Sequence, residues 1–172
     1  LTRPSMEFAE SYLQATQETP MHEMQDNPEL RIWDMRELKS FVQAYQAVDF
    51  SQLPNDPPEE YLWLIDQGEF IGRLFHLHWL NEYRLKNDGQ VDYWIRPSRR
   101  QQGYGRLILQ LTLAYYRRLG LTRVLITCRE DNVGSRKIIE SCGGVYESSI
   151  QDYDFIRPGM RRRYWIDLKN NE

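Results

Sequence analysis

The stretch with the clearest chemical potential runs from Arg100 to Arg106 and reads RQQGYGR. It follows a segment with strand character and opens a segment whose apolar residues recur at helical spacing. Gly103 and Gly105 let the backbone turn sharply and approach a ligand without interference from a Cβ atom. The first N–H groups of a helix have no partner within it, and they lie at the positive end of its dipole. Together these features predict a phosphate-binding turn.

Positive charge is concentrated around this turn. The segment from Tyr93 to Arg129 contains eight arginines and no Asp, Glu or Lys. The whole chain, by contrast, has 22 Lys and Arg residues against 25 Asp and Glu residues, a net charge of -3. Because the rest of the chain is therefore strongly acidic, we expect a local anionic ligand at this segment.

Three kinds of phosphate site compete for the pattern. A dinucleotide fingerprint requires a third glycine three residues after Gly105, where this sequence has Ile108. A P-loop requires Gly-Lys-Ser/Thr after its second glycine, and that is also missing. The remaining arrangement, (Arg/Gln)-x-x-Gly-x-Gly between a strand and a helix, suits the pyrophosphate of coenzyme A. From spacing alone, a glycine turn with a solvated arginine face stays open as an alternative.

The surrounding pattern predicts an α+β fold. We expect helices at 4–16, 34–48, from about 104 to 119 and within 132–144, and strands within 61–80 (a hairpin), 89–97, 122–128, 145–155 and 161–168. This order predicts a mixed, mostly antiparallel central sheet flanked by helices. Its strand–helix–strand unit predicts a parallel pair at the glycine turn.

Two details of these elements can be checked separately. On the helix after the glycine turn, the spacing predicts a buried stripe made of Tyr104, Ile108, Leu111, Tyr115 and Leu119. The proline-rich segment 52–61 predicts a loop, because proline blocks both helices and central strands.

Length and composition restrict the class of protein. A chain of 172 residues is most simply one domain, here 1–172. A pI near 5.7 disfavours general binding to nucleic acid or to anionic membranes. The sequence has no apolar run of the roughly 20 residues that span a bilayer and no signal-peptide pattern, and its two cysteines form no disulfide framework. We therefore expect a cytoplasmic protein with reduced thiols, and leave open a homodimer.

The motif pair in IRPSRRQQGYGRLILQLTLAYYRRLGLTRVLITCREDNVGSRKIIESCGG resembles the coenzyme A-binding half of the Gcn5-related N-acetyltransferase (GNAT) superfamily. The resemblance is strongest over residues 90–144, and the flanking elements fit that fold in order. The C-terminal part is similar to a poorly characterised bacterial subgroup of predicted acetyltransferases.

The resemblance implies a set of residues that bind acetyl-CoA as cosubstrate. Trp94 and Ile95 would offer backbone groups to the acetyl-pantetheine arm, and the turn would hold the pyrophosphate chiefly through backbone N–H groups. The residues of that turn are Arg100, Gln101, Gln102, Gly103, Tyr104, Gly105 and Arg106. Asn132 matches the family's asparagine and Ser135 its small-residue position. Asn132 is also a good N-cap, so ligand contact and capping both stay open.

The implied reaction moves acetyl from acetyl-CoA to an amine, either a small molecule or a peptide, by direct attack in a ternary complex. Gly89 stands where the family usually has a glutamate base, so Asp92 is the substitute expected on the same strand. Ile139 stands where many relatives have a proton-donating tyrosine, so Tyr146 is the expected general acid. The rival reading is a non-catalytic acyl-CoA-binding or regulatory module.

Other polar residues give weaker signals. His76 and His78 share one strand face without a clear third ligand, so we expect no metal site. Cys128 and Cys142 are expected to be structural thiols. Acidic residues at 56–60, with Glu82 and Asp92, would favour a cationic acceptor if they gathered at the site.

Overall fold

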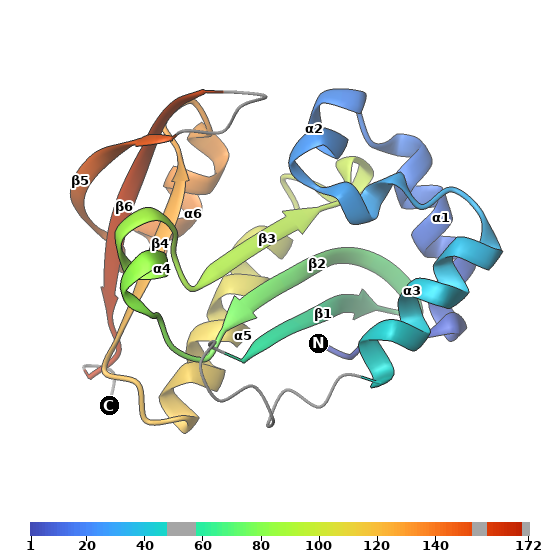
Figure 1. Cartoon of the computed structure of the whole chain (residues 1–172), viewed down its shortest axis with the longest axis horizontal. Coiled ribbons are helices and arrows are strands. Elements are labelled where there is room, and N and C mark those ends of the chain that lie inside the picture. The colour runs from blue at the N-terminus through green and yellow to red at the C-terminus, as the bar shows by residue number, and fades with distance from the viewer. Residues whose placement is uncertain (48–57, 153–157, 170–172) are drawn as a thin grey trace.

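The computed structural model describes residues 1–47, 58–152 and 158–169, and its strands form two three-stranded antiparallel sheets (Figure 1). The first has the order β1–β2–β3 and the second the order β4–β6–β5. The strands are β1 (Glu59–Asp66), β2 (Glu69–Leu77), β3 (Val91–Ile95), β4 (Arg123–Arg129), β5 (Val145–Asp152) and β6 (Gly159–Asp167). The α+β class is therefore confirmed, with two sheets in place of one.

Six α-helices are present in the described residues: α1 (Ala9–Glu18), α2 (Met21–Asp26), α3 (Met35–Ala47), α4 (Glu82–Asn87), α5 (Tyr104–Arg118) and α6 (Val133–Ser141). In the same residues, short 3₁₀ turns lie at Met6–Phe8, Pro28–Arg31 and Pro97–Arg99. The sequence predicted α1, α3, α5 and α6 but not α2 and α4. Each of those two has only six residues, too few to show a helical period. The predicted proline loop lies largely outside the described residues.

The two sheets meet at one point and then diverge. The Gln90 N–H donates to the Leu125 carbonyl at 2.8 Å, and the Leu125 N–H donates to Oε1 of Gln90 at 3.1 Å. A Cβ atom on Gly89 would lie 2.9 Å from the Thr127 nitrogen, so glycine permits this close approach. Beyond it, β3 and β4 splay apart (Figure 1). No ladder joins them in the described residues, so the predicted parallel pair is not confirmed.

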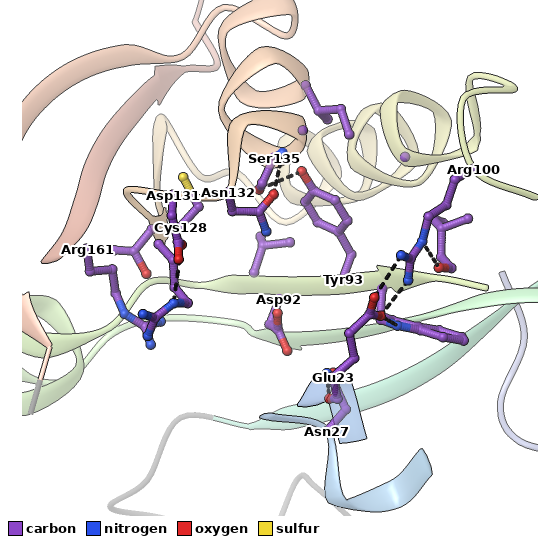
Figure 2. Close-up of a pocket in the computed structure, with 18 of the residues that line it drawn as sticks. Glu23, Asn27, Asp92, Tyr93, Arg100, Cys128, Asp131, Asn132, Ser135 and Arg161 are labelled. Carbon is purple, nitrogen blue, oxygen red and sulfur yellow. Dashed lines mark hydrogen bonds and ion pairs between the residues drawn. The ribbon is translucent and has the colours of Figure 1, made fainter. Parts of the chain in front are cut away.

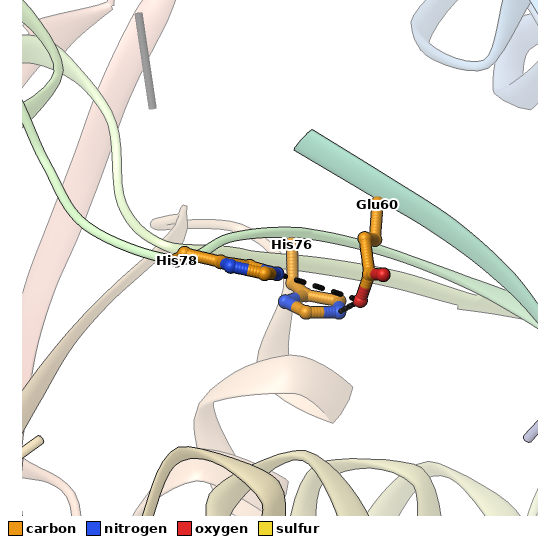
Figure 3. Close-up of side chains that lie close together, drawn as sticks. All are labelled: Glu60, His76 and His78. Atoms are coloured by element: carbon orange, nitrogen blue, oxygen red, sulfur yellow. Dashed lines mark ion pairs between the residues drawn. The ribbon is translucent and has the colours of Figure 1, made fainter. Parts of the chain in front are cut away.

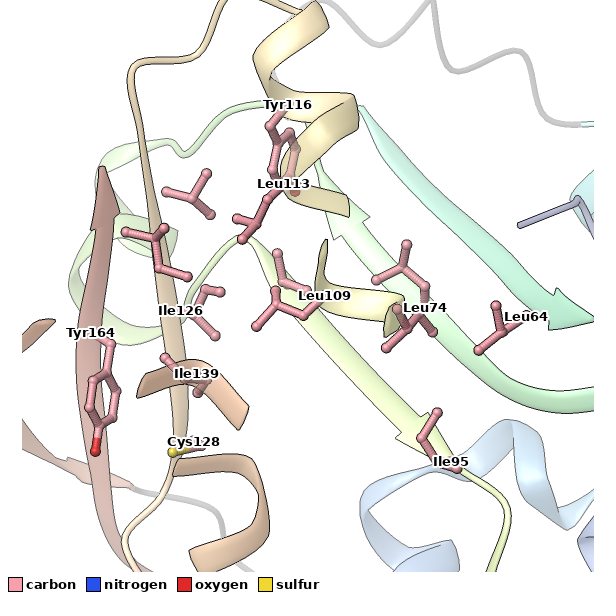
Figure 4. Close-up of a cluster of buried hydrophobic side chains, with 14 of the residues drawn as sticks. Leu64, Leu74, Ile95, Leu109, Leu113, Tyr116, Ile126, Cys128, Ile139 and Tyr164 are labelled. Atoms are coloured by element: carbon pink, nitrogen blue, oxygen red, sulfur yellow. The ribbon is translucent and has the colours of Figure 1, made fainter. Parts of the chain in front are cut away.

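The main hydrophobic core lies between α5 and the two sheets (Figure 4). The buried apolar side of α5 consists of Ile108, Leu109, Leu113 and Tyr116. The predicted stripe was wrong for Leu111 and Leu119, which are 39% and 42% exposed. Apolar residues occur on more than one side of this helix, and spacing alone did not show which side meets the sheets.

Several turns and helix ends are formed by local residues. Gln67 and Gly68 both have positive φ, 48° and 79°, and close the β1–β2 hairpin. Gly120, at φ 80°, ends α5 in the left-handed region. Asp34 caps α3, because its Oδ1 accepts from the Glu37 N–H at 2.8 Å. Each of these features depends on residues close together in the chain.

Candidate functional site

A cavity of about 790 Å³ occupies the gap between the splayed strands β3 and β4, with α2 on one side and the N-termini of α5 and α6 on the other (Figure 2). Eight of the predicted site residues line it: Asp92, Trp94, Ile95, Arg100, Gln101, Gly105, Asn132 and Ser135. The splay is what makes this space, because paired strands would fill it with their own hydrogen bonds.

Five other predicted residues are not part of the lining: Gln102, Gly103, Tyr104, Arg106 and Tyr146. The first four belong to the turn beside the cavity. The Tyr104 hydroxyl donates to Oδ2 of Asp66 at 2.6 Å, so this ring is directed toward the β1–β2 turn. Tyr146 is 51% exposed on β5, and its hydroxyl lies 3.1 Å from that of Ser149.

One edge of β3 is left for a ligand. Two backbone hydrogen bonds show how β3 pairs with β2. The Arg96 N–H donates to the Ile71 carbonyl, and the Leu77 N–H donates to the Gln90 carbonyl. Hydrogen bonding to one neighbour alternates along an antiparallel strand. The backbone groups of Trp94 therefore pair with β2, whereas those of Tyr93 and Ile95 face the cavity. The sequence predicted that Trp94 and Ile95 would offer backbone groups to the ligand. Of these two, only Ile95 has backbone groups directed at the cavity. Tyr93, which was not predicted, has them as well.

The N-terminus of α5 has no side-chain cap. Gly103 precedes it at φ 88°, and Gln101 is also left-handed at φ 60°. The first intrahelical bond is donated by the Leu107 N–H to the Gly103 carbonyl at 2.9 Å. The three preceding N–H groups, at residues 104–106, have no partner within the helix and lie at its positive end. This geometry is that of an anion site.

Gly105 has a packing role in addition. A Cβ atom there would lie 2.6 Å from Cδ1 of Ile138 in α6. Since ordinary contacts are longer by about 1 Å, the glycine lets the two helices approach each other. The pattern Gly-x-Gly thus combines a backbone turn at its first glycine with a helix–helix contact at its second.

Arg100 is held across the cavity by α2. Its guanidinium donates to both carboxylate oxygens of Glu23, at 2.8 and 2.5 Å, and its Nε donates to the Ile95 carbonyl at 2.9 Å. The Trp94 indole also donates to Glu23, at 2.9 Å. Burial opposes ionisation of Glu23, but the hydrogen bonds from Arg100 and Trp94 hold its pKa below the ordinary value.

Further arginines of the cationic segment, Arg96 and Arg99 among them, also bind carboxylates of the chain itself. Arg96 pairs with Glu18 and Glu69, and Arg99 also pairs with Glu69. The local anions expected from composition therefore include the protein's own side chains, which come from distant segments of the sequence. For Arg106 the structure gives no ion pair within the described residues, so its charge remains available beside the α5 turn.

The start of α6 carries a small polar network. Oδ1 of Asn132 accepts from the Ser135 N–H at 3.0 Å, and the Ser135 and Tyr93 hydroxyls lie 3.1 Å apart. Burial raises the pKa of Tyr93, so this phenol is neutral at physiological pH. Burial also raises the pKa of Cys128 to about 11, so its thiol is protonated and unreactive. The capping role of Asn132 is confirmed.

Asp92 projects into the cavity from the face of β3 opposite to that of Tyr93 (Figure 2). Its Oδ2 accepts from Arg73 at 2.5 Å. Arg73 is buried and also contacts Glu29 at 2.7 Å and the side chain of Asn27. Although burial opposes it, the carboxylates of Asp92 and Glu29 raise the pKa of Arg73. The buried cation therefore fixes the orientation of Asp92.

The acidic residues of the lining match those that the sequence suggested only at Asp92. They are Glu23, Asp92 and Asp131, whereas Glu60 and Glu82 are not part of it. Residues 56 and 57 lie outside the described residues. Glu23 comes from α2 and Asn27 directly follows it, and because α2 was not predicted, no pattern pointed to either residue. Tyr93 could have been found from the alternation along β3, which puts it on the face of Val91 and Ile95.

Comparisons with known proteins agree with this geometry. The family model described as an acetyltransferase (GNAT) domain matches residues 10–145, and the chain belongs to this family. A search of curated proteins found no match. In the described residues, no helix combines the length and the apolar character needed to cross a membrane.

Solved structures share the fold at low sequence identity. The RimL ribosomal L7/L12 alpha-N-protein acetyltransferase, solved with coenzyme A, has a TM-score of 0.72 at 19% identity, over 97% of this chain and 94% of its own. A candidate ribosomal-protein-serine acetyltransferase from Vibrio cholerae gives 0.64 at 21%, over 95% and 90%. The candidate acetyltransferase yncA from Salmonella typhimurium, solved with acetyl-CoA, gives 0.59 at 18%, over 94% and 87%.

Proposed function

We propose that the protein transfers acetyl from acetyl-CoA to an amine by direct attack within a ternary complex. The observation that carries this proposal is the cavity between β3 and β4, which is bordered by an open strand edge and an uncapped helix N-terminus. Structural neighbours bind acetyl-CoA or coenzyme A. Here the pyrophosphate would accept from the N–H groups at the start of α5, with Gln101 and Arg106 beside it.

The acetyl-pantetheine arm would extend along β3. The backbone groups of Tyr93 and the Ile95 N–H face the cavity, while the Ile95 carbonyl accepts from Arg100. An extended amide chain can therefore pair with this edge as an added strand would. The Ile95 N–H would stabilise negative charge that develops on the thioester oxygen. Holding the amine beside the thioester supplies the proximity that makes direct attack effective.

The amine must lose a proton, and the departing sulfur must gain one. We propose that Asp92 receives the first proton through water, because its carboxylate is 63% exposed and turned into the cavity. We propose that the Tyr93 hydroxyl, in place of the expected Tyr146, donates the proton that the departing sulfur gains. Tyr93 lines the cavity as a neutral phenol, whereas Tyr146 lies on β5 outside the lining.

The acceptor is proposed to be cationic. Glu23, Asp92 and Asp131 line the cavity, and each would attract an ammonium group before deprotonation. All three already face arginines, Glu23 facing Arg100, Asp92 facing Arg73 and Asp131 facing Arg129, so their attraction for a further cation is reduced. We therefore expect a preference for amines with one additional positive charge over neutral amines, rather than for highly charged polycations.

The experiment measures acetyl-CoA binding and turnover in parallel. Calorimetry with acetyl-CoA should show one site per chain, and binding should raise the melting temperature. Release of free thiol is then followed with a panel of peptide N-terminal amines, lysine side chains, polyamines and neutral amines. Binding without release for any amine would favour the rival, an acyl-CoA-binding or regulatory module. Absence of acetyl-CoA binding would overturn both the proposed acetyltransferase function and this alternative.

A further inference from the structure

A compact group of three potential metal ligands lies on the β1–β2 hairpin, outside the cavity (Figure 3). Glu60 in β1 and His76 in β2 are direct cross-strand partners, and His78 follows two residues later. One ligand atom from each residue lies within 4.8 Å of the other two. The sequence showed only the two histidines, and the pairing of β1 with β2 adds the carboxylate as a third donor.

The spacing of the donor atoms suits a bound ion. Nε2 of His76 and Nε2 of His78 lie 3.1 and 3.5 Å from the same carboxylate oxygen of Glu60. Metal–ligand bonds of about 2.0–2.1 Å in tetrahedral geometry put neighbouring donor atoms about 3.4 Å apart. The two distances to Glu60 are close to this spacing, and all three donor atoms lie within 4.8 Å of one another.

The histidine nitrogens lack other partners. Both ring nitrogens of His76 and Nε2 of His78 are buried without a hydrogen bond. The His76 side chain is only 1% exposed. Its approach to Glu60 does not have hydrogen-bond geometry, and an unsatisfied buried polar group costs about 1–3 kcal/mol. An ion between the three side chains would satisfy the lone pairs on both Nε2 atoms.

The surroundings favour a site with one open side. Tyr115 packs edge-on against His76 and His78, with ring centroids 5.4 and 6.0 Å apart, and Tyr116 packs against His76 at 5.6 Å. These α5 rings hold the imidazoles in place. The side chains of His78 and Glu60 are 26% and 20% exposed, which leaves an entry path and room for a water ligand.

We propose that Glu60, His76 and His78 bind one divalent transition-metal ion of the Zn²⁺ class. Two imidazoles and a carboxylate suit Zn²⁺, Co²⁺ or Ni²⁺ and disfavour Mg²⁺ and Ca²⁺, which prefer oxygen donors. None of the three ligands lines the cavity, so the ion would join β1 to the end of β2 and take no part in acetyl transfer. This proposal does not depend on the proposed function.

The test uses the full chain without an affinity tag, freed of metal with a chelator. Zn²⁺ is titrated by calorimetry, and Co²⁺ by the visible absorption that a tetrahedral cobalt site produces. We expect one ion per chain and a higher melting temperature with Zn²⁺. Mg²⁺ at the same concentration should give neither signal.

Variants locate the site. Glu60→Gln and His78→Gln change partly exposed side chains, so the fold should persist, and circular dichroism checks this. Each should weaken Zn²⁺ binding by more than the roughly 10–100-fold that loss of a supporting residue costs. Glu59→Gln and His22→Gln are the matched controls and should bind as the unaltered chain does. Absence of stoichiometric binding by the unaltered chain, or equal affinities in ligand and control variants, would overturn the proposal.

Discussion

Two helices, α5 and α6, begin beside the same cavity, and their N-termini differ. At α6 the side chain of Asn132 accepts from the Ser135 N–H, so the helix is capped from within the chain. At α5 the preceding residue is a left-handed glycine, and no side chain caps the helix. We therefore expect the two N-termini to have different roles: the uncapped N-terminus of α5 can bind an anion, whereas the capped N-terminus of α6 orients side chains beside the cavity.

The largest expected effect is on turnover, and it concerns Tyr93, whose hydroxyl contacts Ser135 of α6. Because the Tyr93 hydroxyl is paired with Ser135 beside the cavity, Tyr93→Phe should lower turnover about 100-fold, the typical contribution of a general acid. Acetyl-CoA affinity should change little. The measurement is thiol release under conditions where chemistry limits the rate. Tyr146→Phe is the comparison, and a larger loss there would return the role to Tyr146.

The next effect concerns the open N-terminus of α5. Gly103→Val would strain a backbone at φ 88° and should displace the N–H groups behind it. Loss of one charge-assisted hydrogen bond, about 2 kcal/mol, would weaken acetyl-CoA binding about 30-fold. Calorimetry measures the affinity, and urea unfolding measures the cost to the fold.

Gly120→Val is the matched control for that change. Gly120 ends the same helix at φ 80°, and a Cβ atom at either glycine would meet nothing within 4 Å. Both variants should therefore lose a similar 1–3 kcal/mol of stability through backbone strain. Only Gly103→Val should lose affinity. Equal affinities in the two variants would remove the anion site from α5.

A smaller effect is expected at Arg100. Its guanidinium is tied to Glu23 and to the Ile95 carbonyl, so its charge is directed at α2 rather than at the start of α5. Arg100→Met should therefore weaken acetyl-CoA binding only about threefold, and should cost less than about 1 kcal/mol of stability at pH 7. An affinity loss as large as that of Gly103→Val would show that Arg100 turns to the pyrophosphate.

The same variant has a defined pH dependence. The pKa of Glu23 in the folded protein lies below its ordinary value of 4.5. The ion pair with Arg100 therefore stabilises the fold above that value and ceases to do so as the pH falls through the folded pKa. Urea unfolding should separate the unaltered chain from Arg100→Met at pH 7, and the difference should shrink at pH 3. A constant difference would assign the effect to packing.

The smallest effect on binding is expected at Asn132. Asn132→Ala removes the cap of α6 and should cost about 1 kcal/mol of unfolding free energy. Asp34→Ala removes the equivalent cap of α3, away from the cavity, and should cost about the same. Acetyl-CoA affinity should stay within about threefold in both. A selective loss in Asn132→Ala would show that this residue contacts the ligand as well as capping the helix.

How much the sequence could predict depended on the range of the interaction. The hairpin within 61–80, the glycine turn and the N-cap at Asn132 could be predicted, because neighbouring residues determine local dihedral angles. The buried side of α5 was partly wrong, and α2 was missed. In both cases the deciding contacts are made with strands or helices elsewhere in the chain.

The candidate site shows the same limit. Asp92, Ile95 and the turn before α5 could be located by motif and strand position. Glu23 could not, because it reaches Arg100 from 77 residues away in the sequence. The third donor beside His76 and His78 likewise became visible only through the register of β1 with β2.

The sequence by itself determined the local conformations and the concentration of arginine near α5, since both follow from residue types and short spacings. Only the tertiary structure decided what those charges and backbone groups meet. Arg96, Arg99 and Arg100 find carboxylates of the chain itself, while the backbone edge of β3 and the start of α5 are left open. The physical reason is that ion pairs and strand pairing join groups distant in the sequence, and their partners are fixed only when the sheets pack and splay.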